Sequence, residues 1–464
     1  MIAPQLRWTL LLLAVAFAPA GRLPAEPPLP PRPDLQQMIR RAQRLPDTEL
    51  PVMEDLGKPE PIPPAAAAAA PPLSLEELQA WAVGNNPALA VAAARVQAAR
   101  GNWIQAGLPP NPVLSYQGNE IGAMDSAGMQ GGSIGQTFIT GGKLTYSQAA
   151  AAQQLRQVEQ QLAAQQRRVE NDVAVAYFDV LVAQRRIELA EQLLRVAEDA
   201  ISATEELLRI GEVSETELNQ ARNESSLANI QLIKARSGYT AGWRRLAAVV
   251  GVPEIEPVRL LGDVDQGIPQ LTWETSLARL MAQSPQLTAA LAQVEEARWL
   301  VRRAQAEPVP DVSVQVAVMK NTATGDTVSS VTAGIPLPLF NWNQGGITEA
   351  QADLRGAQSD VDRTALRLQS ELADAFLAYD VARQEVARYQ EEILPNSNAN
   401  LELAQEGYRR GLQGFLTLLV AWRNYAENHL AFLDALERLR RSAVVIEGLL
   451  LSGSLEDVNR PRMP

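Results

Sequence analysis

The chain contains few residues that could do chemistry on a substrate. It has no cysteine, which excludes disulfides, thiolate metal sites and a cysteine nucleophile. Its only histidine, His429, lies in the helical pattern "NYAENHLAFLDAL" and is most simply a surface or seam residue. The Gly-rich "GMQGGSIG" lacks the lysine and the following helix of a phosphate loop, so it is interpreted as a hairpin. The sequence favours a protein that is not an enzyme and holds no cofactor or resident metal.

The remaining chemical signal is charge. The formal net charge of −12 disfavours nucleic acid as a partner. Three acids, Glu212, Glu215 and Glu217, follow a glycine in "RIGEVSETEL". Gathered at one place they would attract cations. Alternatively, they are solvated side chains at the start of a helix, where acids favour the positive end of the helix dipole.

The N-terminus has the composition of a secretory signal. Arg7 precedes the apolar run "WTLLLLAVAFA", and "APA" at 18–20 offers a small-residue cleavage site. The run, at about 11 residues, is short for a membrane span. We therefore expect a signal peptide at 1–20 and a Pro/Ala-rich linker at 21–72, with a possible short helix at 33–45. Without a cysteine to acylate, we expect no lipid anchor.

The second half of the chain repeats the first. "NNPALAVAAARVQAARGNW" (85–103) is similar to "QSPQLTAALAQVEEARWLV" (283–301), and Gly211 corresponds to Gly411. The displacement of about 200 residues is far longer than that of solenoid repeats. We expect a first structural repeat at 73–251, a second at 252–451 and a C-terminal tail at 452–464.

Each repeat is expected to run helix, strand, strand, long helix, turn, helix. In the first, Ser74 and Glu77 form a capping box for a helix that Pro87 interrupts. Strands are expected at 112–121 and 131–140, and in the second repeat at 311–320 and 328–340. The valines from Val312 to Val318 alternate with polar or small residues, which is typical of a membrane β-strand and also of a strand in a soluble sheet.

The long helices carry two apolar seams each. Apolar residues recur at three/four spacing from Val169 to Ile201 and from Leu354 to Val386, with a second stripe beside the first. Two seams give each helix a neighbour on both sides, as in a ring of helices. Residues 147–206 would form one continuous helix, whereas Pro395 should break its counterpart in the second repeat. Four strands cannot close a membrane barrel, since about eight are needed, so membrane strands would have to be pooled by an oligomer.

Residues 73–451 resemble the TolC family of outer-membrane efflux factors. The duplicated unit, the paired strands before each long helix and the glycine turns carry this resemblance, and "IPLPLFNWNQGGITEAQADL" and "SIGQTFITGGKL" are most similar to its heavy-metal (CzcC-like) branch. It implies a mainly α fold with a minor β part, assembled as a homotrimer with a 12-stranded β-barrel in outer-membrane lipid that continues into a 12-helix α-barrel across the periplasm. The implied partners are a periplasmic adaptor and an inner-membrane pump of the resistance-nodulation-division type.

The resemblance assigns roles to two groups of residues. Pro336 and Pro338 would end strand pairing, aromatic residues would lie at the membrane–water interface, and glycines would permit the bend into each helix. These junction residues are Phe138, Gly141, Gly142, Pro336, Pro338, Phe340, Trp342 and Gly345. The turns at 209–218 and 409–418 would form the periplasmic mouth and the adaptor contact, with exposed apolar anchors in the second turn. These turn residues are Gly211, Glu212, Glu215, Glu217, Gly411, Leu412, Gly414, Phe415 and Leu416.

The function implied is that of a passive exit duct, with heavy-metal cations as possible cargo. A periplasmic coiled-coil protein without a pore, or a periplasmic adaptor, is the alternative.

Overall fold

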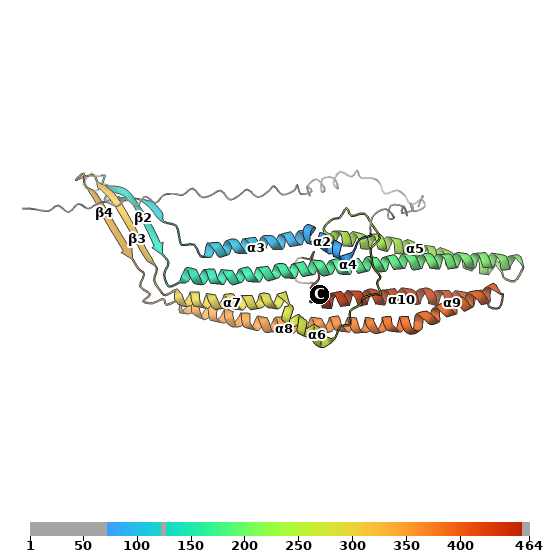
Figure 1. Cartoon of the computed structure of the whole chain (residues 1–464). Helices are drawn as coiled ribbons and strands as arrows, with labels where there is room; N and C mark the ends of the chain where they lie inside the picture. The colour runs from blue at the N-terminus through green and yellow to red at the C-terminus, as the bar shows by residue number, and fades with distance from the viewer. Residues whose placement is uncertain (1–71, 122–126, 457–464) are drawn as a thin grey trace, which may run out of the picture. The chain divides into compact units, whose positions relative to one another are not determined.

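The computed structural model describes residues 72–121 and 127–456, all within the second of two compact units, Ala65–Pro464. The expected signal peptide, the short helix at 33–45, nearly all of the linker and residues 457–464 of the tail lie outside the described residues. The described part is mainly helical with one small antiparallel sheet (Figure 1).

The same order of elements occurs twice along the chain. The first half contains α2 (Leu75–Asn85), α3 (Pro87–Ala106), β1 (Val113–Asn119), β2 (Met129–Phe138), α4 (Lys143–Arg209) and α5 (Glu215–Val250). The second contains α6 (Trp273–Gln283), α7 (Pro285–Ala306), β3 (Val312–Asn321), β4 (Thr327–Gly334), α8 (Gln344–Arg388), the π-helical η2 (Tyr389–Ile393), α9 (Leu394–Arg409) and α10 (Phe415–Glu447).

Local sequence explains where the helices begin and break. Ser74 and Glu77 form the expected capping box of α2, and α3 begins at Pro87 behind an Asn86 cap. In the second half, Pro395 cannot donate a backbone hydrogen bond. The helix switches there to π geometry over Tyr389–Ile393, and the Leu394 amide bonds to the Tyr389 carbonyl five residues back. The α-helical hydrogen bonding is therefore interrupted near Pro395 as expected, but the chain stays helical from Gln344 to Arg409 and does not break.

The strands are close to the expected ones, with one error. The four strands form a sheet in the order β1-β2-β3-β4, and every neighbouring pair is antiparallel. The last strand was expected to run to 340 but ends at Gly334, opposite Ser313. The reason is Pro336, whose ring nitrogen cannot donate to a neighbouring strand.

The helices lie side by side in a layer (Figure 1). Next to the sheet the order is α3, α4, α7, α8, and next to the turns it is α5, α4, α10, then α8 and α9. Elements of the first half, β1, α3 and α5, therefore stand at one edge along the whole length. Elements of the second half, β4, α8 and α9, stand at the other edge.

The largest core lies where α2, α6 and the connection 251–272 cover the long helices. Val169, Leu246, Leu372 and Leu436 are almost completely buried there. The buried Arg440 holds the connection in place, because its guanidinium donates to the carbonyls of residues 264, 266 and 267 and lies 4.7 Å from the centre of the Phe178 ring. Burial lowers the pKa of Arg440, although nearby acids oppose the shift.

Candidate functional site

The sheet has one apolar face. Directly paired residues on neighbouring strands point to the same side. Val316 pairs with Ile134 on one side and with Val331 on the other, so the valine stripe of β3 continues across the sheet. The exposed apolar side chains of this face are Leu114, Tyr116, Ile134, Phe138, Val316, Val318 and Val331.

The opposite face is largely polar or small. Gln315 lies between Gly135 and Thr332, and its amide donates to Ser133 Oγ at 2.8 Å. Ser133 and Ala317 are buried on this side. The apolar side of β3 thus continues onto its neighbours at Ile134 and Val331, although Gln130, Gln136 and Lys320 lie on the same face, and the two surfaces of the sheet differ chemically.

The first strand–helix junction is tied to the second half of the chain. The Lys143 ammonium lies 3.0 Å from Asp311 Oδ1, and the Thr140 amide donates to the same oxygen at 2.9 Å. Burial disfavours the charged carboxylate, but the Thr140 amide and the Lys143 ammonium outweigh it and hold the pKa of Asp311 below its ordinary value. Gly141 has a φ of 65°, and a Cβ there would come within 2.9 Å of the Val309 side chain, so this expected glycine is required.

The second junction bends at a different residue from the one expected. Gly345 lies inside α8 and has no positive φ. The bend is made by Asn343, whose φ is 56° and whose side-chain amide donates to the Ala304 carbonyl at 2.8 Å. Asparagine tolerates this left-handed conformation better than other residues with a side chain. The bending role assigned to Gly345 was wrong, while Gly346 leaves room for the Asn343 amide, which a Cβ would overlap.

An exposed apolar belt follows β4. Phe340 is 91% exposed, and Ile335, Leu337, Leu339 and Trp342 are also exposed. Phe138, at the end of β2, is exposed as well. The belt contains the expected aromatic pair and the prolines, so these residues are gathered in one segment next to the sheet. Their role at a membrane interface stays a prediction.

The two helical turns have the same backbone design. Gly211 and Gly411 have φ values of 81° and 71°. Behind them, the amides of Glu212 and Leu412 bond to the carbonyls of Leu207 and Gly407 at 2.9 and 2.8 Å. This pattern satisfies the free carbonyls at a helix end and requires a left-handed residue, which glycine adopts without strain. Gly414 then serves as the N-cap residue of α10.

The acids of the first turn have separate local surroundings. Glu212 and Glu215 are exposed. Glu217 completes a capping box, because its carboxylate accepts from the Ser214 amide at 3.1 Å. Glu217 therefore stabilises the start of α5, whatever effect its charge has on cations.

The apolar residues of the second turn differ from the expectation. Leu412 and Leu416 are 75% and 70% exposed, as an anchor for a partner would be. Phe415 is only 3% exposed, and its ring packs edge-on against Tyr408 with 5.8 Å between the ring centres. The expectation that Phe415 is exposed was wrong, because the first turn of α10 directs this side chain into the small core between the two helical hairpins.

Sequence reasoning missed the contacts that join the two halves. Thr204 of α4 and Tyr408 of α9 are both buried and share a hydrogen bond of 2.8 Å. Arg186 of α4 donates to Asp434 and Glu437 of α10 at 2.5 and 2.8 Å. These partners are more than 200 residues apart in the sequence, so no local pattern predicts them.

The described residues lack a cluster of metal ligands. No group of three or more His, Cys, Asp or Glu residues in the described ranges could hold a metal ion. The His429 ring lies tilted against that of Tyr425 with 4.2 Å between ring centres and shares a hydrogen bond with Asn398, and burial lowers the pKa of His429. None of the helices that the structure describes is long and apolar enough to cross a membrane.

Comparison with known proteins identifies the family. A family model described as outer membrane efflux protein matches residues 80–252 and 277–450. The chain belongs to this family. The outer membrane efflux protein described here is 25% identical to the cobalt-zinc-cadmium resistance protein CzcC of Cupriavidus metallidurans over 82% of this chain and 91% of CzcC.

Two further similarities extend the comparison. The chain is 25% identical to the solvent efflux pump outer membrane protein SrpC of Pseudomonas putida, over 60% of this chain and 61% of SrpC. A solved structure of CusC, from a study of folding and transmembrane channel formation, aligns with a TM-score of 0.70 at 20% identity over 82% of this chain and 92% of CusC. At that identity the likeness concerns the fold. The resemblance of this efflux protein to the TolC family is thereby confirmed.

Proposed function

We propose that the protein is the outer-membrane exit duct of a tripartite efflux system, built from three copies of the chain. The observation that carries this proposal is the pair of open edges. At one edge α5 exposes Leu227 and Ile230, and at the other α8 exposes Leu366 and Leu377. Because the two edges carry different elements, contact between copies is head to tail and must close into a ring or grow without limit.

Three copies would supply enough strands to close a membrane barrel. They would supply twelve strands, above the minimum of about eight, and twelve helices for the tube. In this assembly β4 of one copy pairs with β1 of the next, and α8 and α9 pack against α3 and α5. We infer that each chain arose by duplication, with repeats at 73–251 and 252–451.

The two-faced sheet sets the orientation in the membrane. We infer that the face with Val316 contacts lipid and that the face with Gln315 lines the duct. The belt from Ile335 to Trp342, together with Phe138, then lies at the periplasmic membrane–water interface, where aromatic residues are enriched in membrane barrels. The helices extend into the periplasm.

The turns form the periplasmic mouth and the contact for an adaptor. Leu412 and Leu416 are the exposed apolar residues suited to that contact, and the three glutamates of the first turn would draw cations to the mouth. Energy for transport comes from an inner-membrane pump of the resistance-nodulation-division type, and the chain itself is not an enzyme.

Heavy-metal cations are the proposed cargo, on the strength of the similarity to CzcC. The similarity to SrpC makes organic solvents the competing class.

Fractionation and susceptibility tests address this function. The protein should be recovered with the outer membrane and remain trimeric in mild detergent. Deletion of its gene should sensitise cells to cobalt, zinc or cadmium more than to toluene. A soluble monomer would contradict the duct, whereas sensitivity to toluene alone would contradict only the cargo.

A further inference from the structure

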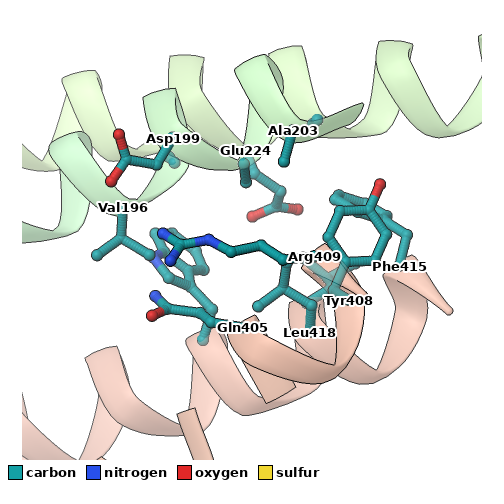
Figure 2. Close-up of a pocket in the computed structure, with 14 residues that line it drawn as sticks. Val196, Asp199, Ala203, Glu224, Gln405, Tyr408, Arg409, Phe415 and Leu418 are labelled. Carbon is teal, nitrogen blue, oxygen red and sulfur yellow. The ribbon is translucent and has the colours of Figure 1, made fainter. Parts of the chain in front are cut away.

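A cavity lies between the two helical hairpins near the turns (Figure 2). One wall comes from α4 and α5 and includes Ala200 and Ala203, and the other comes from α9 and α10 and includes Phe415 and Leu418. These side chains make most of the lining apolar. The volume is about 40 Å³. At 10–15 Å³ for each water molecule, this space has room for about three waters, and hence for a ligand of a few carbon atoms.

In the described ranges, one buried hydrogen-bond donor at the cavity lacks a protein acceptor, and one exposed arginine without an ion pair lies beside it. Trp422 Nε1 is buried and has no partner among the described residues. The Arg409 side chain extends across the space between the hairpins (Figure 2), and its guanidinium forms no ion pair within the described part of the chain. The next residue, Arg410, pairs instead with Glu406. A buried donor without an acceptor is unfavourable, so the cavity is suited to a ligand that supplies one.

The acidic side chains that the structure describes at the cavity do not accept a hydrogen bond from Trp422 Nε1 or pair with Arg409. Glu224 is buried and its carboxylate pairs with Arg423 of α10. Asp199 is exposed on the α4 wall, on the side toward which Arg409 extends. The buried indole N–H of Trp422 needs an acceptor oxygen, and the exposed guanidinium of Arg409 beside it favours an oxygen that carries negative charge.

We propose that this cavity binds a small monocarboxylate with a short apolar chain. The carboxylate accepts hydrogen bonds from Trp422 Nε1 and from the Arg409 guanidinium. The chain lies against Ala200, Ala203 and Leu418. Because its walls belong to both hairpins, an occupied cavity holds α4 and α5 against α9 and α10. This binding site does not depend on whether the protein is a duct.

Fluorine NMR on the purified full-length protein in detergent tests the site. The probe is 3-fluoropropionate, and the neutral control is 3-fluoropropan-1-ol, which has the same short chain. Saturable line broadening is expected for the acid, with affinity at least tenfold higher than that of the alcohol. Equal affinity for acid and alcohol, or no saturable binding of the acid, would overturn the proposal.

Variants locate the binding. Arg409→Gln and Trp422→Phe should each weaken acid binding at least tenfold, and Ala200→Leu, which fills the cavity, should abolish it. Arg410→Gln is the matched control, because this neighbouring arginine pairs outside the cavity, and it should bind like wild type. Circular dichroism verifies folding. If Trp422→Phe does not fold, Arg409→Gln decides, and unchanged binding in that surface variant places the probe elsewhere and contradicts the proposal.

Discussion

A single arginine should distinguish the two faces of the sheet. Val316 is the fifth of ten residues in β3, which places it near mid-depth of the proposed membrane barrel, and its cross-strand partners Ile134 and Val331 share its apolar face. On the lipid side, an arginine at the bilayer midplane costs about 2–4 kcal/mol. Since about 1.4 kcal/mol corresponds to a factor of ten, Val316→Arg should lower the equilibrium population of assembled protein roughly 30- to 700-fold per copy.

The matched variant is Gln315→Arg, one residue away on the other face. It loses the hydrogen bond to Ser133, which is worth about 0.5–1.5 kcal/mol, but its charge would face water in the proposed duct. The assay is the amount of detergent-resistant trimer recovered from outer membranes at matched expression. We expect severe loss for Val316→Arg and at most a tenfold loss for Gln315→Arg. The opposite order would mean that the sheet faces the other way.

Four further predictions concern the turns and the first junction. Replacing the three glutamates of the first turn with glutamine preserves the helix cap and should lower the preference for cations in bilayer conductance measurements. An unchanged reversal potential would show that these acids do not select cations. Phe415→Ala should destabilise the protein by about 3–5 kcal/mol, measured by denaturant unfolding. Aspartate in place of the exposed Leu412 or Leu416 should instead reduce efflux and leave the trimer intact. Lys143→Met should lower the melting temperature most at neutral pH. Folding depresses the pKa of Asp311, so the ion pair stabilises the protein at pH values above the ordinary carboxyl pKa of 3.8. This stability is lost as pH falls through the lower folded-state pKa. A difference in melting temperature between wild type and variant that grows on acidification would contradict this pairing.

Elements with a strong local signal were predictable from the sequence. Pro395 lacks an amide hydrogen and disrupts the hydrogen bonding of a helix interior, and Gly211 and Gly411 stand where a tight turn needs a positive φ. Period-two alternation predicted which side of β3 is apolar. The duplicated order of elements followed from the similarity between the halves.

Other features depended on tertiary contacts and were missed or misplaced. The bend before α8 was assigned to a glycine, but Asn343 makes it because the Ala304 carbonyl, 39 residues earlier, accepts from its side chain. Phe415 looked like an exposed anchor in the sequence, yet it is buried against Tyr408. Lys143 and Asp311 gave no signal as a pair, since 168 residues separate them.

The central claim is that three copies close into one ring through their two edges, and cross-linking tests it most directly. The chain has no cysteine, so two can be introduced without background. Asn223→Cys on α5 and Leu403→Cys on α9 are both exposed, lie at opposite edges and stand within about three helical turns of the turn end. Treating intact cells with a short bis-maleimide should convert the double variant into a ladder that stops at three chains, while each single variant stays monomeric. A ladder that stops at two chains, continues beyond three, or is missing would contradict the closed trimer.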